Sequence, residues 1–228
     1  MTRTEAVARI LRDIGFRPAG GSLDDVIVSC LKEAQKELQK GKTLPRFLLN
    51  IDAQLTLAAG DHSVTLPADF IRESDETRIR FFSDGSDVPT YLQRKYYIDA
   101  SMANLHGSAD SLTTNDPVAP SVYIVRVGRS AAFLDFITTA DVEYTLYWDY
   151  YSKAAELATG DTENEWLADD AGALWLIGTA GIKVATPLNN TGAVAGFQAL
   201  QQQGRAACFG EDLAAETASG PVRMGANL

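Results

Sequence analysis

Carboxylates are the side chains of this 228-residue chain whose types and spacing could do chemistry. Asp69 and Glu73 stand four positions apart, and Asp75 and Glu76 follow them closely. Such a cluster could bind a cation, and paired carboxylates serve as acid and base in glycoside hydrolysis. Because the cluster lacks the Asp and Gly spacing of an EF-hand loop, we predict no metal site. An acidic-site hydrolase that uses Asp69 and Glu73 is the third of our three hypotheses.

Neither the histidines nor the remaining carboxylate pairs suggest catalysis. His62 and His106 are both expected in turns or loops, and neither has a nearby Ser or Cys motif to activate. Asp24-Asp25 is expected in a first helical turn, where the macrodipole favours negative charge, and Asp169-Asp170 is expected on a solvated helix face. The sequence has no nucleophile elbow, no phosphate-binding loop and no C-x-x-C pair. We therefore predict no catalytic residue and no cofactor.

Aromatic residues gather around the strand predicted over 142–150. Strict alternation places Tyr144, Trp148 and Tyr150 on its buried face. Tyr147 and Tyr151 fall on the opposite face, where they could stack on a sugar or contact another protein. We favour a contact with another subunit or a tail protein, because aromatic residues are enriched in such contacts. A β-sandwich module that binds carbohydrate or another surface through these two tyrosines is the second hypothesis.

The amino-acid composition limits which partners the protein can bind and in which compartment it is expected. The net charge of −10 and the sequence pI of about 4.7 argue against a sequence-independent nucleic-acid binder, which needs clustered Lys and Arg. No apolar run reaches the length of a membrane span, and the first residues do not resemble a signal peptide. We expect a soluble protein, made in a cytoplasm, with no membrane partner. Cys30 and Cys208 are expected to be free thiols.

Hydrophobic periodicity gives the order of the elements. Apolar stripes predict two N-terminal helices, over 4–16 and 22–40. Alternation then predicts a strand over 51–57 that pairs with 64–66 as a hairpin. Residues 91–104 fit either a short helix or an irregular arm. Further strands are expected over 76–82, 122–127, 132–137 and 142–150.

Helical character returns near residue 161. A capping box of Thr162 and Glu165 is expected to begin a helix that Pro187 ends, and a last helix is expected from Gly192 to about Ala218. Small residues on the apolar faces of these two helices should allow close helix–helix approach. They are Gly178, Gly181, Gly204 and Ala207.

This order predicts an α+β fold with one interrupted helical part. We expect a four-helix bundle from 1–45 and 160–216, an inserted antiparallel sheet or small sandwich over 46–159, and an extended C-terminal tail over 217–228. The expected structural core includes Trp166, Leu167, Trp175, Phe197, Leu66, Pro67 and Phe70.

Two motifs resemble a known family. The segment Val64-Thr65-Leu66-Pro67-Ala68-Asp69-Phe70 resembles the strand and Leu-Pro-x-Asp-Phe step of tailed-bacteriophage head-to-tail adaptor proteins, also called neck or connector proteins. The polar segment 162–165, followed by Trp166-Leu167 and a small-apolar helix, resembles a second feature of that family. The resemblance covers roughly 22–216, although Ala168-Asp169-Asp170 stands where the family often has Ala-Pro-Asp.

The resemblance implies a structural protein of the virion. Such adaptors form a ring, often a dodecamer, at the head–tail junction, between the portal protein and a downstream tail or nozzle protein. DNA passes through the lumen only as cargo, and an acidic lumen would not hold it. The predicted contacts with the portal are Arg223, Met224 and Leu228 in the tail. This head-to-tail adaptor, made in the host bacterial cytoplasm, is the leading hypothesis.

Overall fold

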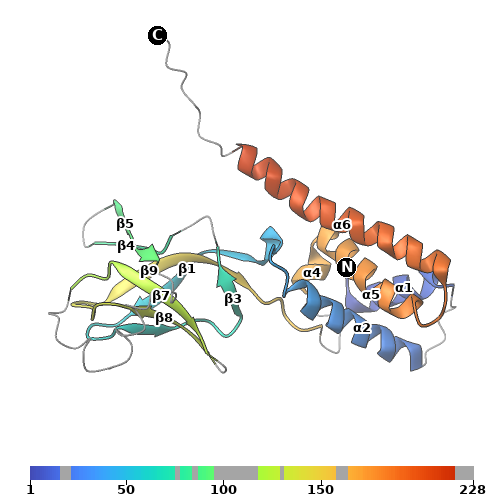
Figure 1. Ribbon diagram of the computed structural model, residues 1–228, viewed down its shortest axis with the longest axis horizontal. Helices are drawn as coiled ribbons and strands as arrows, with labels where there is room; N and C mark the ends of the chain where they lie inside the picture. Colours follow the sequence, from blue (N-terminus) through green and yellow to red (C-terminus); the bar gives the residue numbers. More distant parts are fainter. Residues whose placement is uncertain are drawn as a thin grey trace, which may run out of the picture. The chain divides into compact units, whose positions relative to one another are not determined.

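The computed structural model describes residues 1–15, 22–74, 78–83, 87–94, 118–128, 131–157 and 164–218, with the backbone alone at Ser22 and over 211–218. Its fold is α+β, as expected (Figure 1). Contacts divide the chain into two compact units. We call Met1–Leu48 with Ala154–Leu228 the helical unit and Leu49–Lys153 the β unit.

The helical unit begins with two amphipathic helices. α1 (Arg3–Asp13) starts with a capping box, in which the Thr2 hydroxyl accepts the Glu5 N–H and the Glu5 carboxylate accepts the Thr2 N–H. This exchange satisfies two N–H groups that a helix N-terminus otherwise leaves unpaired. α2 (Ser22–Leu38) buries Ile27 and Leu31. A 3-10 turn, η1 (Arg46–Leu48), ends this part of the unit.

Three helices, where the sequence predicted two, form the C-terminal part of this unit. They are α4 (Glu165–Ala168), α5 (Asp170–Ala185) and α6 (Thr191–Ala218).

The break between α4 and α5 is at Asp169, whose backbone is extended and whose carboxylate accepts the Gly172 N–H at 2.6 Å. Asn164 caps α4 through the Trp166 N–H, so the predicted capping box of Thr162 and Glu165 is wrong. Both caps follow from short polar side chains that bond a backbone N–H two or three residues ahead.

α5 lies at the centre of the helical unit, and α6 runs along it (Figure 1). The close approach predicted for their glycines is confirmed. A Cβ added at Gly178 would lie 2.4 Å from the Gln201 backbone nitrogen, and one at Gly204 would lie 2.3 Å from that of Trp175. α1, α2 and α4 also contact α5. The structure has five helices in its described part and does not confirm a four-helix bundle.

Aromatic rings fill the interior between these helices. The ring of Trp166 lies edge-on to Phe47, with centroids 5.2 Å apart, and also edge-on to Trp175, at 5.7 Å. Trp175 in turn contacts Phe209 of α6. Leu167 and Phe197 are buried as well. α6 extends to Ala218, so residues 217 and 218, expected in the tail, are helical.

The β unit contains two sheets. The five-stranded sheet has the order β1 (Leu49–Leu57), β9 (Tyr144–Ser152), β4 (Arg80–Phe82) and β5 (Pro89–Tyr91), and β3 (Phe70–Glu73) also pairs with β9. The four-stranded sheet has the order β2 (Ser63–Thr65), β8 (Ala132–Phe136), β7 (Val122–Val127) and β6 (Gln93–Arg94). All pairs are antiparallel except β6 with β7.

The predicted hairpin of 51–57 with 64–66 is wrong. β1 pairs with β9, whereas β2 pairs with β8 in the other sheet. The turn between them bonds to Ala140, which accepts the Gly60 N–H and donates to the Asp61 carbonyl, each at 2.9 Å. Alternation decides which side chains face the core, but it does not decide which strand is the neighbour.

Side chains from both sheets form one core. The five-stranded sheet contributes Leu146 and Trp148, and the other contributes Tyr123 and Phe136. Of the predicted core residues, Leu66 and Phe70 are buried here, and Phe70 stacks on Trp148 with centroids 5.4 Å apart. Pro67 is only half-buried, because it lies in the turn where its carbonyl accepts the Phe70 N–H.

Candidate functional site

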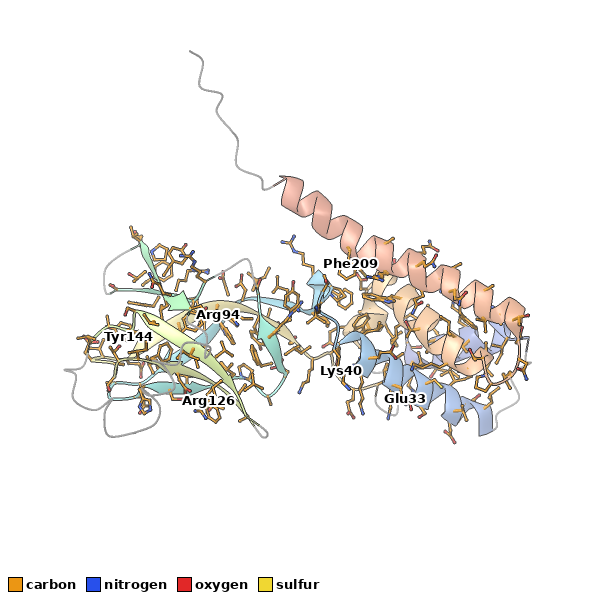
Figure 2. The ribbon with its side chains drawn as sticks, in the orientation of Figure 1. Glu33, Lys40, Arg94, Arg126, Tyr144 and Phe209 are labelled. Carbon is orange, nitrogen blue, oxygen red and sulfur yellow. The ribbon has the colours of Figure 1, made fainter. Side chains whose placement is uncertain are left out.

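Glu73, the candidate of the acidic-site hypothesis, is buried and paired. Only 3% of its side chain is exposed. Its Oε1 accepts the Tyr123 hydroxyl, and its Oε2 lies 3.0 Å from the Arg94 guanidinium, which Figure 2 labels within the β unit. Since β3 belongs to one sheet and β6 and β7 to the other, these contacts connect the two sheets. Glu73 therefore serves to hold the two sheets together. Sequence reasoning missed this role because the partners of Glu73 are distant along the chain.

The other members of the acidic cluster do not assemble with Glu73. The Asp69 carboxylate is 3.4 Å from the Tyr150 hydroxyl, and burial, followed by the charge of Asp69, raises the pKa of Tyr150. Asp75 and Glu76 lie outside the described residues. Over the ranges that the structure describes, no three His, Cys, Asp or Glu side chains gather as metal ligands would. The hydrolase and cation hypotheses thus gain no assembled site.

The histidines and carboxylate pairs have similarly local roles. His62 is exposed, and its carbonyl accepts the Phe136 N–H; His106 lies outside the described residues. Asp24-Asp25 lies in the first turn of α2, as expected. Asp169-Asp170 was expected on a solvated helix face, but Asp169 caps α5 and Asp170 lies in its first turn, where the dipole favours it.

Tyr147 and Tyr151 are half-buried on the surface of the five-stranded sheet that faces away from the core; we call this surface the outer face. The Phe82 ring lies edge-on to Tyr147, with centroids 5.6 Å apart. The Arg72 guanidinium lies over the Tyr151 ring, 5.1 Å from its centroid. A sugar stacks on an open aromatic ring, and Arg72 covers one side of Tyr151. This geometry fits protein contact better than carbohydrate binding.

An ion pair and a backbone hydrogen bond hold two carboxylates near the bulge in β1. At a bulge in β1, Asp52 has a φ of 55°, its N–H donates to the buried Asp149 carboxylate at 2.7 Å, and its own carboxylate pairs with Arg80. The alternation of this strand gave no signal that Asp149 has this partner. Phe82 and Tyr91, in contrast, are 42% and 56% exposed. The outer face therefore combines exposed aromatic rings with the Asp52–Arg80 ion pair.

Replacing Glu73 with glutamine tests the connection between the sheets. Glu73→Gln keeps the shape and an acceptor for Tyr123, but it leaves Arg94 without its ion pair, so we expect a loss of about 1–3 kcal/mol in the free energy of unfolding. Urea denaturation measures it. Glu143→Gln, at an exposed position of the same unit, is the matched control and should change stability by less than about 0.5 kcal/mol. Equal effects of both variants would contradict the structural role.

Comparison with known proteins adds the family. A sequence model of the family described as SU10 adaptor protein matches residues 1–225. The chain belongs to the SU10 adaptor protein family. The predicted resemblance to phage head-to-tail adaptors is thereby confirmed. No curated protein matches this family member significantly.

Other features bear on the family assignment less directly. The described helices of this SU10 adaptor family member include none with the length and apolar character that crossing a membrane requires. Cys30 and Cys208 do not form a disulfide, and burial raises the pKa of Cys30. Arg223, Met224 and Leu228, predicted to contact the portal, lie outside the described residues.

Proposed function

We propose that this SU10 adaptor family member is a structural head-to-tail adaptor of a tailed phage. It forms a ring, a dodecamer, under the portal protein and joins the portal to a downstream tail or nozzle protein in the neck of the virion. The match of the family over residues 1–225 carries the proposal. The proposed role includes no catalytic step.

The division into two units supports this role. A connecting subunit must contact one protein above it, another below it and its own copies on either side. The helical unit and the β unit give the chain separately folded surfaces for these contacts. Tyr147 and Tyr151, on the outer face of the β unit, are the proposed contacts with another subunit or with the tail protein.

Charge supports the proposed DNA channel. Each copy carries a net charge of −10, so a ring of copies has a strongly negative field. DNA binds where Lys and Arg side chains release its counterions, and an acidic lumen offers little of this binding. DNA would then move through the channel as cargo, without being held.

Deleting the gene from the phage tests the proposed function. We expect heads without attached tails, and loss of packaged DNA from those heads, both visible by negative-stain microscopy. The intact gene supplied from a plasmid should restore joined particles. Joined, DNA-filled particles in its absence would overturn the proposal. Native mass spectrometry of the neck from wild-type particles measures the number of copies in the ring.

Truncation after Ala218 tests the proposed portal contact. Removing residues 219–228, which include Arg223, Met224 and Leu228, should abolish binding to purified portal rings and leave the melting temperature unchanged. Arg223→Ala and Leu228→Ala should each weaken binding in part, as measured by cosedimentation. Binding of the truncated chain at wild-type affinity would refute the contact.

A further inference from the structure

Among the described strands of the five-stranded sheet, β1, β3 and β5 have a neighbour on one side only, and β1 and β5 are the two ends of the strand order. In the part of the chain that the structure describes, β1 pairs with β9 alone and β5 pairs with β4 alone. β1 is nine residues long and contains no Lys or Pro, which often protect an exposed strand edge, although it has a bulge between Asn50 and Ala53. β5 is three residues long and begins with Pro89.

The ladder shows which backbone groups of β5 face away from the sheet. The Leu92 N–H donates to the Ile79 carbonyl at 2.9 Å, so these residues form a hydrogen-bonded antiparallel pair. Antiparallel ladders alternate between bonded and non-bonded pairs. Pro89 and Tyr91 therefore direct their backbone groups outward. Pro89 fits this position because the N–H that it lacks would have no ladder partner.

The same alternation determines the open edge of β1. Arg80 and Tyr91 form a non-bonded pair, so the backbone N–H and carbonyl of Arg80 point toward β9, where they bond to Tyr147. The backbone groups of Tyr147 therefore point toward β4. On its other side Tyr147 forms a non-bonded pair with Gln54, so the N–H and carbonyl of Gln54 point away from the sheet. Thr56, two residues further, does the same. Each open edge thus has two residues, separated by one residue, whose backbone groups point away from the sheet.

Strand directions make the two edges complementary. β1 and β4 both run antiparallel to β9, and β5 runs antiparallel to β4, so β1 and β5 have opposite directions. When copies of one sheet stand side by side in the same orientation, β1 of one copy meets β5 of the next in the antiparallel sense. Gln54 then exchanges both bonds with Tyr91, and the Thr56 N–H donates to the Pro89 carbonyl.

Exposed apolar side chains accompany both edges. Ile51 on β1 is 59% exposed, and Val88 and Tyr91 at β5 are 72% and 56% exposed. On β1 the Asp52 carboxylate is paired with Arg80, whereas Asp87, two residues before Pro89, is exposed. Pairing of the two edges would bury the apolar side chains.

We infer that β1 of one copy pairs with β5 of the next, so that the five-stranded sheet continues from subunit to subunit. This inference rests on the proposed ring, because a closed ring of identical chains requires two different, mutually complementary surfaces on each chain. The occupant of each edge is a second copy of this chain.

Cross-linking in assembled particles tests the pairing. The two native cysteines are first removed by Cys30→Ser and Cys208→Ala. Gln54→Cys and Tyr91→Cys are then introduced together. In the proposed pairing the new cysteine of one copy lies about 5 Å from that of the next, within reach of a short bis-maleimide. Within one chain, three strand spacings separate them by roughly 14 Å, beyond its reach. We expect a ladder of covalent oligomers in denaturing gels. Thr145→Cys with Tyr91→Cys, in which the first cysteine lies on an interior strand, should give none.

Two outcomes of this experiment are distinct. Particles that are joined and DNA-filled but give no ladder overturn the edge pairing and leave the adaptor function standing. Joined, DNA-filled particles that form without the chain overturn the adaptor function itself.

A charge variant keeps the test decisive if the cysteine variants do not assemble. Thr56→Lys places a charge on the open edge, and Thr145→Lys places one directly opposite it on an interior strand; both positions are exposed. We expect Thr56→Lys to reduce the yield of joined particles at least about tenfold and Thr145→Lys to leave it within about twofold, with equal melting temperatures. Equal yields from the two variants would overturn the inference.

Discussion

Trp166→Ala should lower the free energy of unfolding of the helical unit by about 3–5 kcal/mol. Trp166 is fully buried, and its ring contacts Phe47 and Trp175 edge-on. Alanine would remove the largest buried side chain of this unit and leave a cavity between rings that α4, α5 and η1 hold in place. Chemical denaturation followed by circular dichroism at 222 nm measures the change.

Two variants separate the cavity from other causes. The buried indole N–H of Trp166 has no hydrogen-bond partner among the described residues, so Trp166→Phe should cost clearly less than alanine. Leu188→Ala removes a side chain that is 42% exposed and should change stability by less than about 0.5 kcal/mol. A Trp166→Ala loss below about 1 kcal/mol would contradict the packing described above.

Gly204→Ala should lower the free energy of unfolding by about 2 kcal/mol, although alanine is the better helix former. The new Cβ would lie 2.3 Å from the Trp175 backbone nitrogen and 2.7 Å from the Ala171 carbonyl oxygen. Backbone atoms of α5 cannot turn aside as a flexible side chain can, so α6 must shift as a whole. Overpacking of this kind costs about 1–3 kcal/mol, which exceeds the gain in helix propensity of about 1 kcal/mol.

Gly196→Ala is the matched control on the same helix. A Cβ at Gly196 meets nothing within 4 Å, so only the propensity term applies. We expect this variant to stabilise the chain by about 0.5–1 kcal/mol. Urea denaturation of both variants under one condition makes the comparison. Changes of the same sign at the two positions would show that α5 and α6 do not approach closely at Gly204.

Features that depend on neighbouring residues could be predicted from the sequence. Strict alternation located β9, and the buried positions of Leu146, Trp148 and Tyr150 follow from it. Small residues at helical spacing predicted the contact of α5 with α6. In both cases the periodicity of one segment is sufficient, because it determines which side faces the core.

Features that depend on distant partners could not be predicted. The carboxylate of Glu73 looked like part of an acidic cluster, but Tyr123 and Arg94 neutralise it across the two sheets. The partner of β1 is β9, and no local pattern distinguishes that strand from β2. The break at Asp169 was missed because the apolar stripe from Trp166 to Leu174 continues past it. The packing of the core decides which strands pair and which side chains contact each other.

The pairing of Leu49 with Tyr151 has a consequence for the order of folding. The β unit interrupts the helical unit in sequence, so Phe47 is synthesised long before Trp166, which it contacts. Once β1 and β9 pair, the ends of the insertion lie side by side, and the loop that the helices must close shrinks to a few residues. Loop-closure entropy grows with loop length, so a folded β unit lowers the entropic barrier to joining the two helical segments. We therefore expect the β unit to fold first and the helical unit to fold second.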